Sequence, residues 1–516
     1  MKASVRYAII AAVIAGVFAL RHFRDKPESP GEAQRASGRY HIPASAKAFR
    51  FGTLDFSACE LERKHSGATT EAFCAPFEVP EDRARPDGRR IALKLALIES
   101  REAADDDFIV FLAGGPGQSA VNAWPQIAAS LEPARKRRHV LLLDQRGTGA
   151  SNPLECANDE DEDATLDFDP ARITARTQAC LEEVSKTADP RFYTTSDAVA
   201  DIEALRQALG APKFNLVGVS YGTRVAQQYL KRHREGVRSI VLDSPVPNEL
   251  VLGGEFARNL DDALKAQFDL CKADPACAKA FPDPFADLIT LRDSLNAAPR
   301  SVHFADPVTA ARRERRLDGH GLAALVRLYA YTPETAALIP LTVHQSRAGN
   351  DAPMAGQLEL MMQGIDELVG NGMQLSVLCS EDGDRLPAQS GRPAAKDSVL
   401  GTQLVDAWNA QCAVWPRGQR PADFNEPASG DAPVLVLSGE FDPVTPPRYG
   451  EQIVKTLANA KFILGRGQGH SIMGRGCLPG VIGRFMDKLE PAALDTSCAE
   501  RLGPTPHFID FNGGTP

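Results

Sequence analysis

The feature that most constrains the fold of this 516-residue chain is the pentapeptide Gly218–Gly222, which reads Gly-Val-Ser-Tyr-Gly. It follows the apolar run 214–217, which predicts a buried strand, and it precedes the helix-like run 224–230. A serine in a Gly-x-Ser-x-Gly turn between a strand and a helix is a nucleophile elbow, in which a tight, strained turn holds the hydroxyl clear of the sheet. A chance match in a Gly-rich loop would lack these flanks. The pattern predicts that Ser220 is a catalytic nucleophile.

Two later loops carry the expected partners of this serine. The run Pro433–Gly439 predicts a buried strand, and Asp442 follows it on a Pro-rich loop. A short strand over 461–464 leads into a Gly-rich loop that ends in His470. Serine, acid and histidine thus follow one another in the order typical of the elbow. We expect His470 to take the proton of Ser220 and Asp442 to fix the tautomer of the imidazole.

Each of these partners has an alternative. Asp243 follows the strand 239–242 and is a rival acid, because some members of this fold place the acid one strand earlier. We favour a loop-capping role for Asp243. A histidine is often purely structural, but the other histidines among the 10 of this chain lack the strand–loop setting of His470.

The loop 113–119, Ala-Gly-Gly-Pro-Gly-Gln-Ser, follows the buried strand predicted over 108–112. An oxyanion hole needs two backbone N–H groups directed at the developing charge. We expect one from Tyr221, directly after the nucleophile, and the other from Gly115, because glycine lets the backbone approach a substrate closely. The loop lacks the Gly-Lys-Ser/Thr ending of a phosphate-binding loop, so we expect no nucleotide there.

In combination, these motifs resemble the proline iminopeptidase and tripeptidyl aminopeptidase group of α/β-hydrolases. The resemblance rests on Gly-Gly-Pro-Gly, the run 143–151 (Leu-Asp-Gln-Arg-Gly-Thr-Gly-Ala-Ser), the elbow, and the Glu-Phe-Asp-Pro-Val-Thr-Pro loop with its late Gly-His, and it covers residues from about 50 to 500. It implies an α/β-hydrolase fold, a mostly parallel twisted sheet with helices on both faces. Proline iminopeptidases usually have His where this chain has Ala113, which moves the match toward the tripeptidyl aminopeptidase-like branch.

The order of motifs predicts how the chain is divided. Far more residues separate Ser220 from Asp442 than two βα units require, and the excess has helical periodicity, so we expect an inserted, mainly helical lid. We expect the run 91–97 to be the first strand and an antiparallel edge. The expected segments are a signal peptide or membrane anchor (1–24), a linker (25–45), a hydrolase core in two parts (46–249 and 425–516) and the lid (250–424).

The lid should contain the groups that recognise the substrate. Recognition of a free N-terminal ammonium needs carboxylates in a partly dry pocket. The strand-like run 376–382 ends in Glu381 and Asp382, which we expect to hold the amine, and Glu255 is a second candidate. Acids on a surface loop are the alternative explanation for Glu381 and Asp382, and Glu255 is the weaker candidate.

The N-terminus and the cysteines indicate export. Lys2 and Arg6 precede the apolar run 7–20, which is shorter than the ~18 residues of a spanning helix and typical of a secretory signal. Positive charge at 21–24 disfavours cleavage, so an uncleaved anchor is the alternative. We expect a periplasmic or secreted protein, or one held at the inner membrane through residues 7–20. Adjacent pairing is the simplest connectivity for the ten cysteines: Cys59–Cys74, Cys156–Cys180, Cys271–Cys277, Cys379–Cys412 and Cys477–Cys498.

These features predict an exported serine hydrolase that releases single residues or short peptides from free N-termini through an acyl-enzyme. An esterase or lactonase is the alternative, because the same groups serve both reactions, and a non-catalytic surface module is a remote one. A net charge of -9 without a long basic stripe argues against a nucleic-acid partner. No Cys-x-x-Cys pair occurs, and we expect neither a metal nor a cofactor.

Overall fold

The computed structural model describes residues 39–43, 45–62, 69–102, 107–156, 168–366, 371–388 and 397–514. The expected signal or anchor over 1–24 lies outside these ranges, as does most of the expected linker over 25–45. Tyr40 and Ile42 are buried, and the Tyr40 ring packs edge-on against Phe108. The folded body therefore begins before residue 46, where the sequence placed the boundary.

Among the described residues, ten strands form one sheet in the order β1-β2-β3-β4-β6-β5-β7-β8-β11-β12. Strands β1 to β4 pair antiparallel, and β4 also pairs antiparallel with β6. From β6 onward all pairs are parallel. The strands are β1 (Ala48–Phe51), β2 (Leu54–Glu62), β3 (Thr69–Pro80), β4 (Arg90–Ile98), β5 (Phe108–Leu112), β6 (His139–Leu143), β7 (Phe214–Val219), β8 (Val237–Asp243), β11 (Val434–Gly439) and β12 (Ala460–Gly465).

The parallel strands are continuous apolar runs because helices cover both of their faces. One buried core joins the sheet to α5, α6 and α17, and a second joins the opposite face to α3 and α18. Within β7, Leu216 belongs to the first core and Val217 to the second, as the two-residue period of a strand requires. These helices are α3 (Ala120–Leu131), α5 (Thr195–Leu209), α6 (Tyr221–Arg232), α17 (Pro447–Val454) and α18 (Leu478–Lys488), and α4 (Pro170–Val184) lies before α5.

The run 91–97 is antiparallel as expected, but it is neither the first strand nor an edge. It forms most of β4, which lies between β3 and β6 in the interior of the sheet. The three preceding strands are amphipathic, with polar and charged residues on their solvent face. Because these strands contain no continuous apolar run, the sequence pattern did not indicate them.

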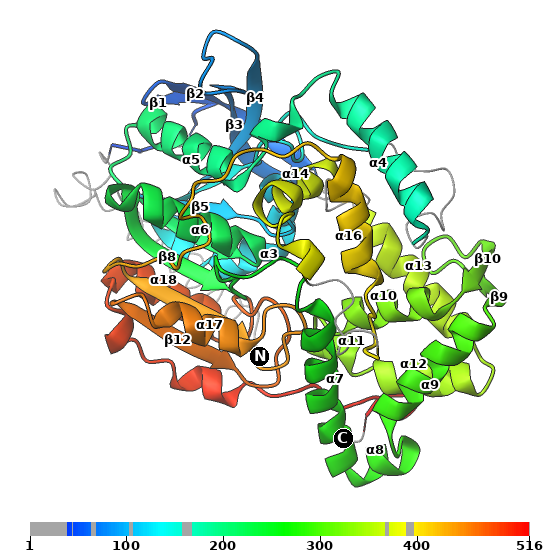
Figure 1. Ribbon diagram of the computed structural model, residues 1–516. Helices are drawn as coiled ribbons and strands as arrows, with labels where there is room; N and C mark the ends of the chain where they lie inside the picture. Colours follow the sequence, from blue (N-terminus) through cyan, green and yellow to red (C-terminus); the bar gives the residue numbers. More distant parts are fainter. Residues whose placement is uncertain are drawn as a thin grey trace, which may run out of the picture.

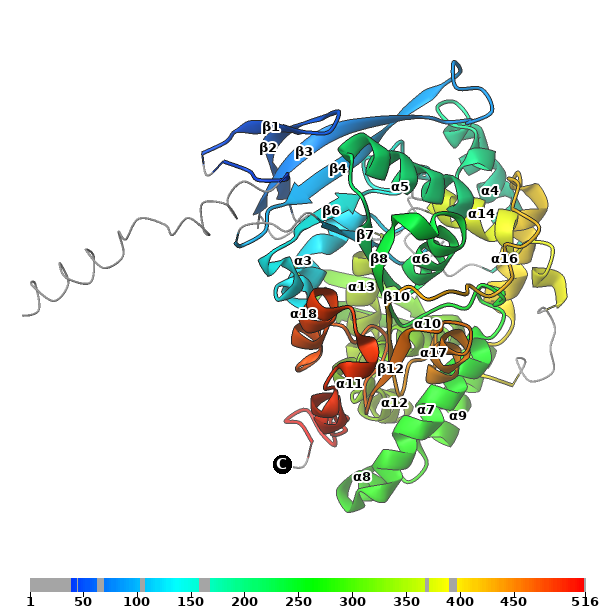
Figure 2. The same ribbon diagram turned by 90° about the vertical axis from the view of Figure 1, so that its left-hand side faces the viewer.

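The segment between β8 and β11 is mainly helical; most of it has its own buried core, and its later part, which includes Cys379 and Cys412, packs into the first core of the sheet. Figure 1 shows most of these helices beside the sheet, on the side away from β1–β4, while the helix 371–381 lies next to α4, and Figure 2 shows the same arrangement in a second view. The elements are α7 (Phe256–Ala273), α8 (Pro275–Ala280), α9 (Pro284–Ala297), β9 (Arg300–Ala305), β10 (Arg312–Leu317), α10 (Gly319–Tyr329), α11 (Pro333–Ala336), α12 (Ile339–Arg347), α13 (Ala352–Asp366), α14 (Asn371–Glu381) and α16 (Gln403–Val414). We call this segment the lid.

All ten cysteines lie in the described ranges, and they form the five adjacent pairs expected from the sequence. The bond between Cys379 and Cys412 joins lid helices α14 and α16.

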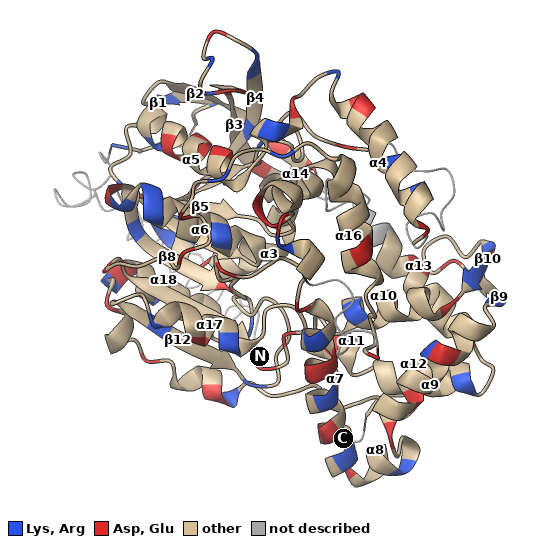
Figure 3. Ribbon diagram, viewed as in Figure 1, with Lys and Arg blue, Asp and Glu red and all other residues tan. Residues whose placement is uncertain are grey.

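Acidic and basic residues are interspersed over the helices, with a local basic group on β10 (Figure 3). No described helix has the length and apolar character needed to cross a membrane.

Candidate active site

Ser220 occupies the tight turn between β7 and α6. Its backbone has φ 54° and ψ -122°, a conformation that is strained for a residue with a side chain. The flanking glycines are required by close packing. A Cβ on Gly218 would lie 2.5 Å from the main-chain oxygen of Gly222, and a Cβ on Gly222 would lie 2.1 Å from that of Leu112. The local geometry is therefore that of a strained turn which only small neighbours permit.

His470 and Asp442 are in direct contact. The Nδ1 atom of His470 lies 2.8 Å from Oδ2 of Asp442 and donates to it, since a carboxylate can only accept. Asp442 also accepts from the main-chain N–H groups of Val444 and Thr445, each at 2.8 Å, and from the Thr445 hydroxyl at 2.9 Å. With Nδ1 committed to Asp442, Nε2 is the nitrogen left to take a proton from a nucleophile.

The two groups shift each other's pKa. Burial alone would raise the pKa of Asp442, but the charge of His470 and its hydrogen bond outweigh burial, and the pKa is lowered. Burial alone would lower the pKa of His470, but the charge and hydrogen bond of Asp442 outweigh it, and the pKa is raised above its usual value of 6.5. The His470 side chain is only 8% exposed, so water screens this pair weakly.

Asp243 ties the elbow to the histidine loop. Its main-chain oxygen accepts the N–H of Ser220 at 2.9 Å. Its carboxylate accepts from the hydroxyl of Ser471 at 2.8 Å and from the N–H groups of Ile472 and Met473 at 2.9 and 3.0 Å. Asp243 is fully buried and caps the loop directly after His470. The loop-capping role favoured from the sequence is the one that the contacts show.

The Gly-rich loop after β5 lies against the nucleophile. A Cβ on Gly114 would lie 3.3 Å from the Cβ of Ser220, which brings the loop to the elbow. Gly115 has φ +103°, a conformation that favours glycine. Tyr221 is the first residue of α6, where the N–H has no partner within the helix. That the N–H groups of Gly115 and Tyr221 form the oxyanion hole stays a prediction.

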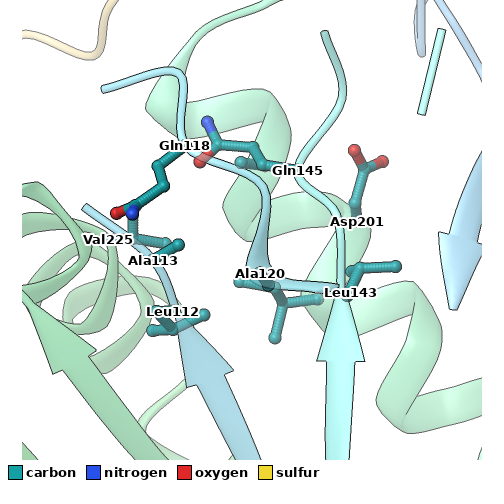
Figure 4. A pocket seen from close by; sticks show the side chains of 10 residues that line it. Leu112, Ala113, Gln118, Ala120, Leu143, Gln145, Asp201 and Val225 are labelled. Carbon is teal, nitrogen blue, oxygen red and sulfur yellow. The ribbon is translucent and has the colours of Figure 1, made fainter. Parts of the chain in front are cut away.

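A small cavity lies beside this loop (Figure 4). The side chains of Gln118, Gln145 and Asp201 supply its polar lining, and Leu112 and Val225 belong to its apolar lining. Its volume of about 20 Å³ is that of roughly one water molecule. In this conformation the cavity is too small for a substrate side chain.

The run 376–382 is not a strand. Residues 376–381 form the end of helix α14, in which the residues from Gly372 to Glu381 are buried apart from Gln374, and Asp382 follows directly. Asp382 is fully buried and is bound by Arg224 at 3.0 Å and by Arg385. Its charge is thus already paired, and its side chain does not reach the surface of the site.

Glu381 is also fully buried. One carboxylate oxygen accepts the N–H of Thr195 at 2.7 Å, and the other lies 3.7 Å from Arg224 without a hydrogen bond. Burial, which outweighs the charge of Arg224, raises the pKa of Glu381 to about 7. The structure therefore places Glu381 and Asp382 beneath the surface, and an ammonium group could reach neither in this conformation.

Glu255 is more accessible than the other two acids. It precedes α7, and its side chain is 33% exposed. Its carboxylate accepts from the Tyr449 hydroxyl at 2.7 Å and from Arg448 at 3.0 Å. One turn later, Asn259 donates to the main-chain oxygen of Val444 at 2.8 Å. Glu255 therefore lies where the lid meets the loop that carries Asp442.

The lid also contacts His470 directly, which sequence reasoning missed. The main-chain oxygen of Tyr331 accepts a hydrogen bond from the main-chain N–H of His470 at 2.7 Å. The two side-chain rings meet edge to face, with their centroids 5.0 Å apart. Tyr331 follows the end of lid helix α10. No motif marks this tyrosine, because the contact joins segments that are distant in the sequence.

Comparison with known proteins agrees with this geometry. A family model described as the alpha/beta hydrolase fold matches residues 107–317, and one described as TAP-like protein matches residues 397–498. Serine protease Hip1 of Mycobacterium tuberculosis is 26% identical over 460 residues, which cover 82% of this chain and 86% of the relative. The tripeptidyl aminopeptidase of Streptomyces lividans is 24% identical over 510 residues, 90% of this chain and 89% of the relative.

A further relative, carboxylesterase B of M. tuberculosis, is 26% identical over 477 residues, which cover 82% of this chain and 86% of the relative. Together the two family models include the elbow serine, Asp442 and His470; the first extends into the lid as far as residue 317, and the second begins within it at residue 397. The parallel part of the sheet, the elbow and these matches agree: the chain has the α/β-hydrolase fold with a C-terminal part that matches the TAP-like model, and it is a serine hydrolase.

Proposed function

We propose that this serine hydrolase is an aminopeptidase, which releases single residues or short peptides from free N-termini. Ser220 attacks the scissile carbonyl while Nε2 of His470 takes its proton. The N–H groups of Gly115 and Tyr221 stabilise the oxyanion. His470 then donates the proton to the leaving amine, and water hydrolyses the acyl-enzyme in the second half of the reaction.

The observation that carries this proposal is the joint placement of His470, Asp442 and Glu255 where the lid meets the core. The first two are bonded to each other, and the elbow and the histidine loop are both bonded to Asp243. Glu255 offers the ammonium group of a substrate a half-buried carboxylate beside the Asp442 loop. The relatives named serine protease and tripeptidyl aminopeptidase support the same substrate class.

An esterase is the second candidate, and the relative named carboxylesterase B favours it. Triad and oxyanion hole serve amides and esters alike. The two candidates differ in whether they need a free amine. An aminopeptidase loses its activity when the substrate amine is acylated, whereas an esterase does not depend on that group.

Export is the second part of the proposal. Five disulfides persist in oxidising compartments, and this supports a periplasmic or secreted location. Whether the N-terminal apolar run is cleaved or anchors the protein at the inner membrane is decided by N-terminal sequencing of the mature protein. The proposed partner is a peptide with a free N-terminus, without nucleic acid.

A substrate panel tests the aminopeptidase proposal. Fluorogenic amides of one to three residues are compared with the free and the acetylated amine, on wild type, Ser220→Ala and Glu255→Gln. We expect only the free amines to be cleaved, activity to vanish in Ser220→Ala, and KM to rise in Glu255→Gln. Equal rates on free and acetylated peptides, together with fast hydrolysis of nitrophenyl esters, would instead identify an esterase.

A further inference from the structure

We propose that Arg327 of the lid forms a carboxylate-binding subsite beside His470, so that the enzyme prefers substrates that carry a carboxylate near the scissile bond. That the substrate is a peptide rests on the proposed function, whereas the position of Arg327 is independent of it.

Arg327 lies on the lid element that touches the catalytic histidine. It is in the last turn of α10, and the chain continues from this turn to Tyr331. The main-chain oxygen of Tyr331 accepts a hydrogen bond from the main-chain N–H of His470. The positive charge of Arg327 is near enough to act against protonation of His470 and so to lower its pKa, although Asp442 outweighs this effect. The guanidinium therefore lies within electrostatic reach of the reacting groups.

Among the described residues, the side chain of Arg327 has a ring contact with Phe256 but no ion pair and no hydrogen bond. The other buried and half-buried lid arginines have carboxylate partners; for example, Arg300 lies 3.0 Å from Asp351, and Arg315 lies 2.6 Å from Glu359. A half-buried cation without a counter-ion is unfavourable unless a ligand neutralises it. The exception at Arg327 thus singles it out as a binding group.

An aromatic ring holds the guanidinium in place. Its central carbon lies 4.8 Å from the ring centroid of Phe256, and that ring packs edge-on against Trp408 at 6.0 Å. A guanidinium stacked on a ring keeps its N–H fork free at the edge. Because this fork matches the two oxygens of a carboxylate, stacking prepares Arg327 for bidentate binding.

Phe256 directly follows Glu255, so a candidate ammonium site and the carboxylate subsite meet at the first residues of α7. Glu255 is held by Arg448 and Tyr449 rather than by Arg327. Both contacts use Oε2 of Glu255, so its Oε1 is available to an ammonium group, and the guanidinium of Arg327 is available to a carboxylate. The carboxylate that fits could be the C-terminus of a short peptide or an acidic side chain.

Matched tripeptides with free amines test the subsite. One pair differs by Glu against Gln, and a second pair differs by a free against an amidated C-terminus. We expect wild type to favour the carboxylate in at least one pair by about 10- to 100-fold in kcat/KM, the range of a charge-assisted hydrogen bond. A lower kcat/KM for the amidated peptide identifies the C-terminal carboxylate as the ligand. A lower kcat/KM for the Gln peptide identifies the Glu side chain as the ligand.

Variants assign this preference to Arg327. At a pH above the midpoint of the pH–rate profile, where His470 is neutral, Arg327→Met should abolish the preference and leave the neutral substrates within about twofold. Arg327→Lys should keep part of the preference, because the charge remains without the fork. Arg258→Gln is the control, since Arg258 is an exposed lid arginine paired with Asp262. Equal kcat/KM within both substrate pairs in wild type overturns the subsite, and this result does not depend on whether any variant folds.

A pair of esters separates failure of the subsite from failure of the aminopeptidase proposal. If no peptide is cleaved, the mono-nitrophenyl ester of glutaric acid is compared with that of glutaramic acid, in which an amide replaces the carboxylate. A preference for the acid that Arg327→Met removes keeps the subsite while the peptidase proposal fails. Equal rates on the two esters refute the subsite as well.

Discussion

Replacing each of the two buried aspartates near His470 by asparagine distinguishes the catalytic acid from the loop cap. Asp442→Asn preserves the shape of the side chain but presents an uncharged group to Nδ1 of His470. The imidazole then loses the partner that fixes its tautomer and stabilises its charged form. A change of this kind in a Ser-His-Asp triad lowers kcat about 10⁴-fold, or about 5 kcal/mol of transition-state stabilisation.

Asp243→Asn acts through the histidine loop instead. Its carboxylate accepts three hydrogen bonds from Ser471, Ile472 and Met473. An amide group replaces one acceptor oxygen by a donor, so at least one buried N–H or hydroxyl loses its partner. Each such loss costs about 1–3 kcal/mol, and we expect the free energy of unfolding to fall by about 2–4 kcal/mol.

The assay combines kcat/KM on a free-amine peptide with urea unfolding of both variants. Asp442→Asn should lose most of its activity, and the pH midpoint of its kcat/KM, which reports deprotonation of His470, should shift to lower pH. Asp243→Asn should lose stability first, with a smaller loss of activity. The reasoning is refuted if Asp243→Asn loses about 10⁴-fold in kcat with unchanged stability while Asp442→Asn retains its rate, because Asp243 would then be the catalytic acid.

Three further predictions follow from the same geometry. In wild type, kcat/KM should rise with pH through a midpoint above 6.5, because the pKa of His470 is raised and only its neutral form accepts a proton; a midpoint below 6 on a pH–rate profile would contradict this. Gly222→Ala should abolish activity or soluble expression, since its Cβ would lie 2.1 Å from a main-chain oxygen of β5. The control Gly480→Ala, whose Cβ would lie 3.4 Å from the nearest atom, should behave as wild type. Removal of the Cys379–Cys412 bond, which spans 33 residues, should lower the free energy of unfolding in urea by about 2–4 kcal/mol; an unchanged midpoint would show that it does not hold α14 and α16 together.

The motifs of the core were readable from the sequence because local chemistry fixes them. The elbow turn needs small residues on both sides of Ser220, so its pattern is short but demanding. Local chemistry also marks helix α5 before the elbow strand, which begins at a capping box on Thr194 and ends at Gly210 in the left-handed conformation. The disulfide pairs were also readable, because each links cysteines close in the sequence.

Tertiary context decided the features that the sequence did not reveal. The run 376–382 is apolar and buried on nearly all sides, so periodicity alone could not separate a buried strand from the helix α14. The burial of Glu381 and Asp382 depends on Arg224, which comes from the helix after the elbow. The contact of Tyr331 with His470 likewise joins the lid to a loop of the core, and no local pattern records such pairs.

The central claim is that Ser220 is the nucleophile that His470 and Asp442 activate. Labelling with a fluorophosphonate probe, followed by peptide mapping by mass spectrometry, tests it directly. We predict one adduct on Ser220 in wild type, none in Ser220→Ala, and much slower labelling in His470→Ala. A folded wild-type protein that stays unlabelled, or that carries the adduct on another residue, would contradict the account.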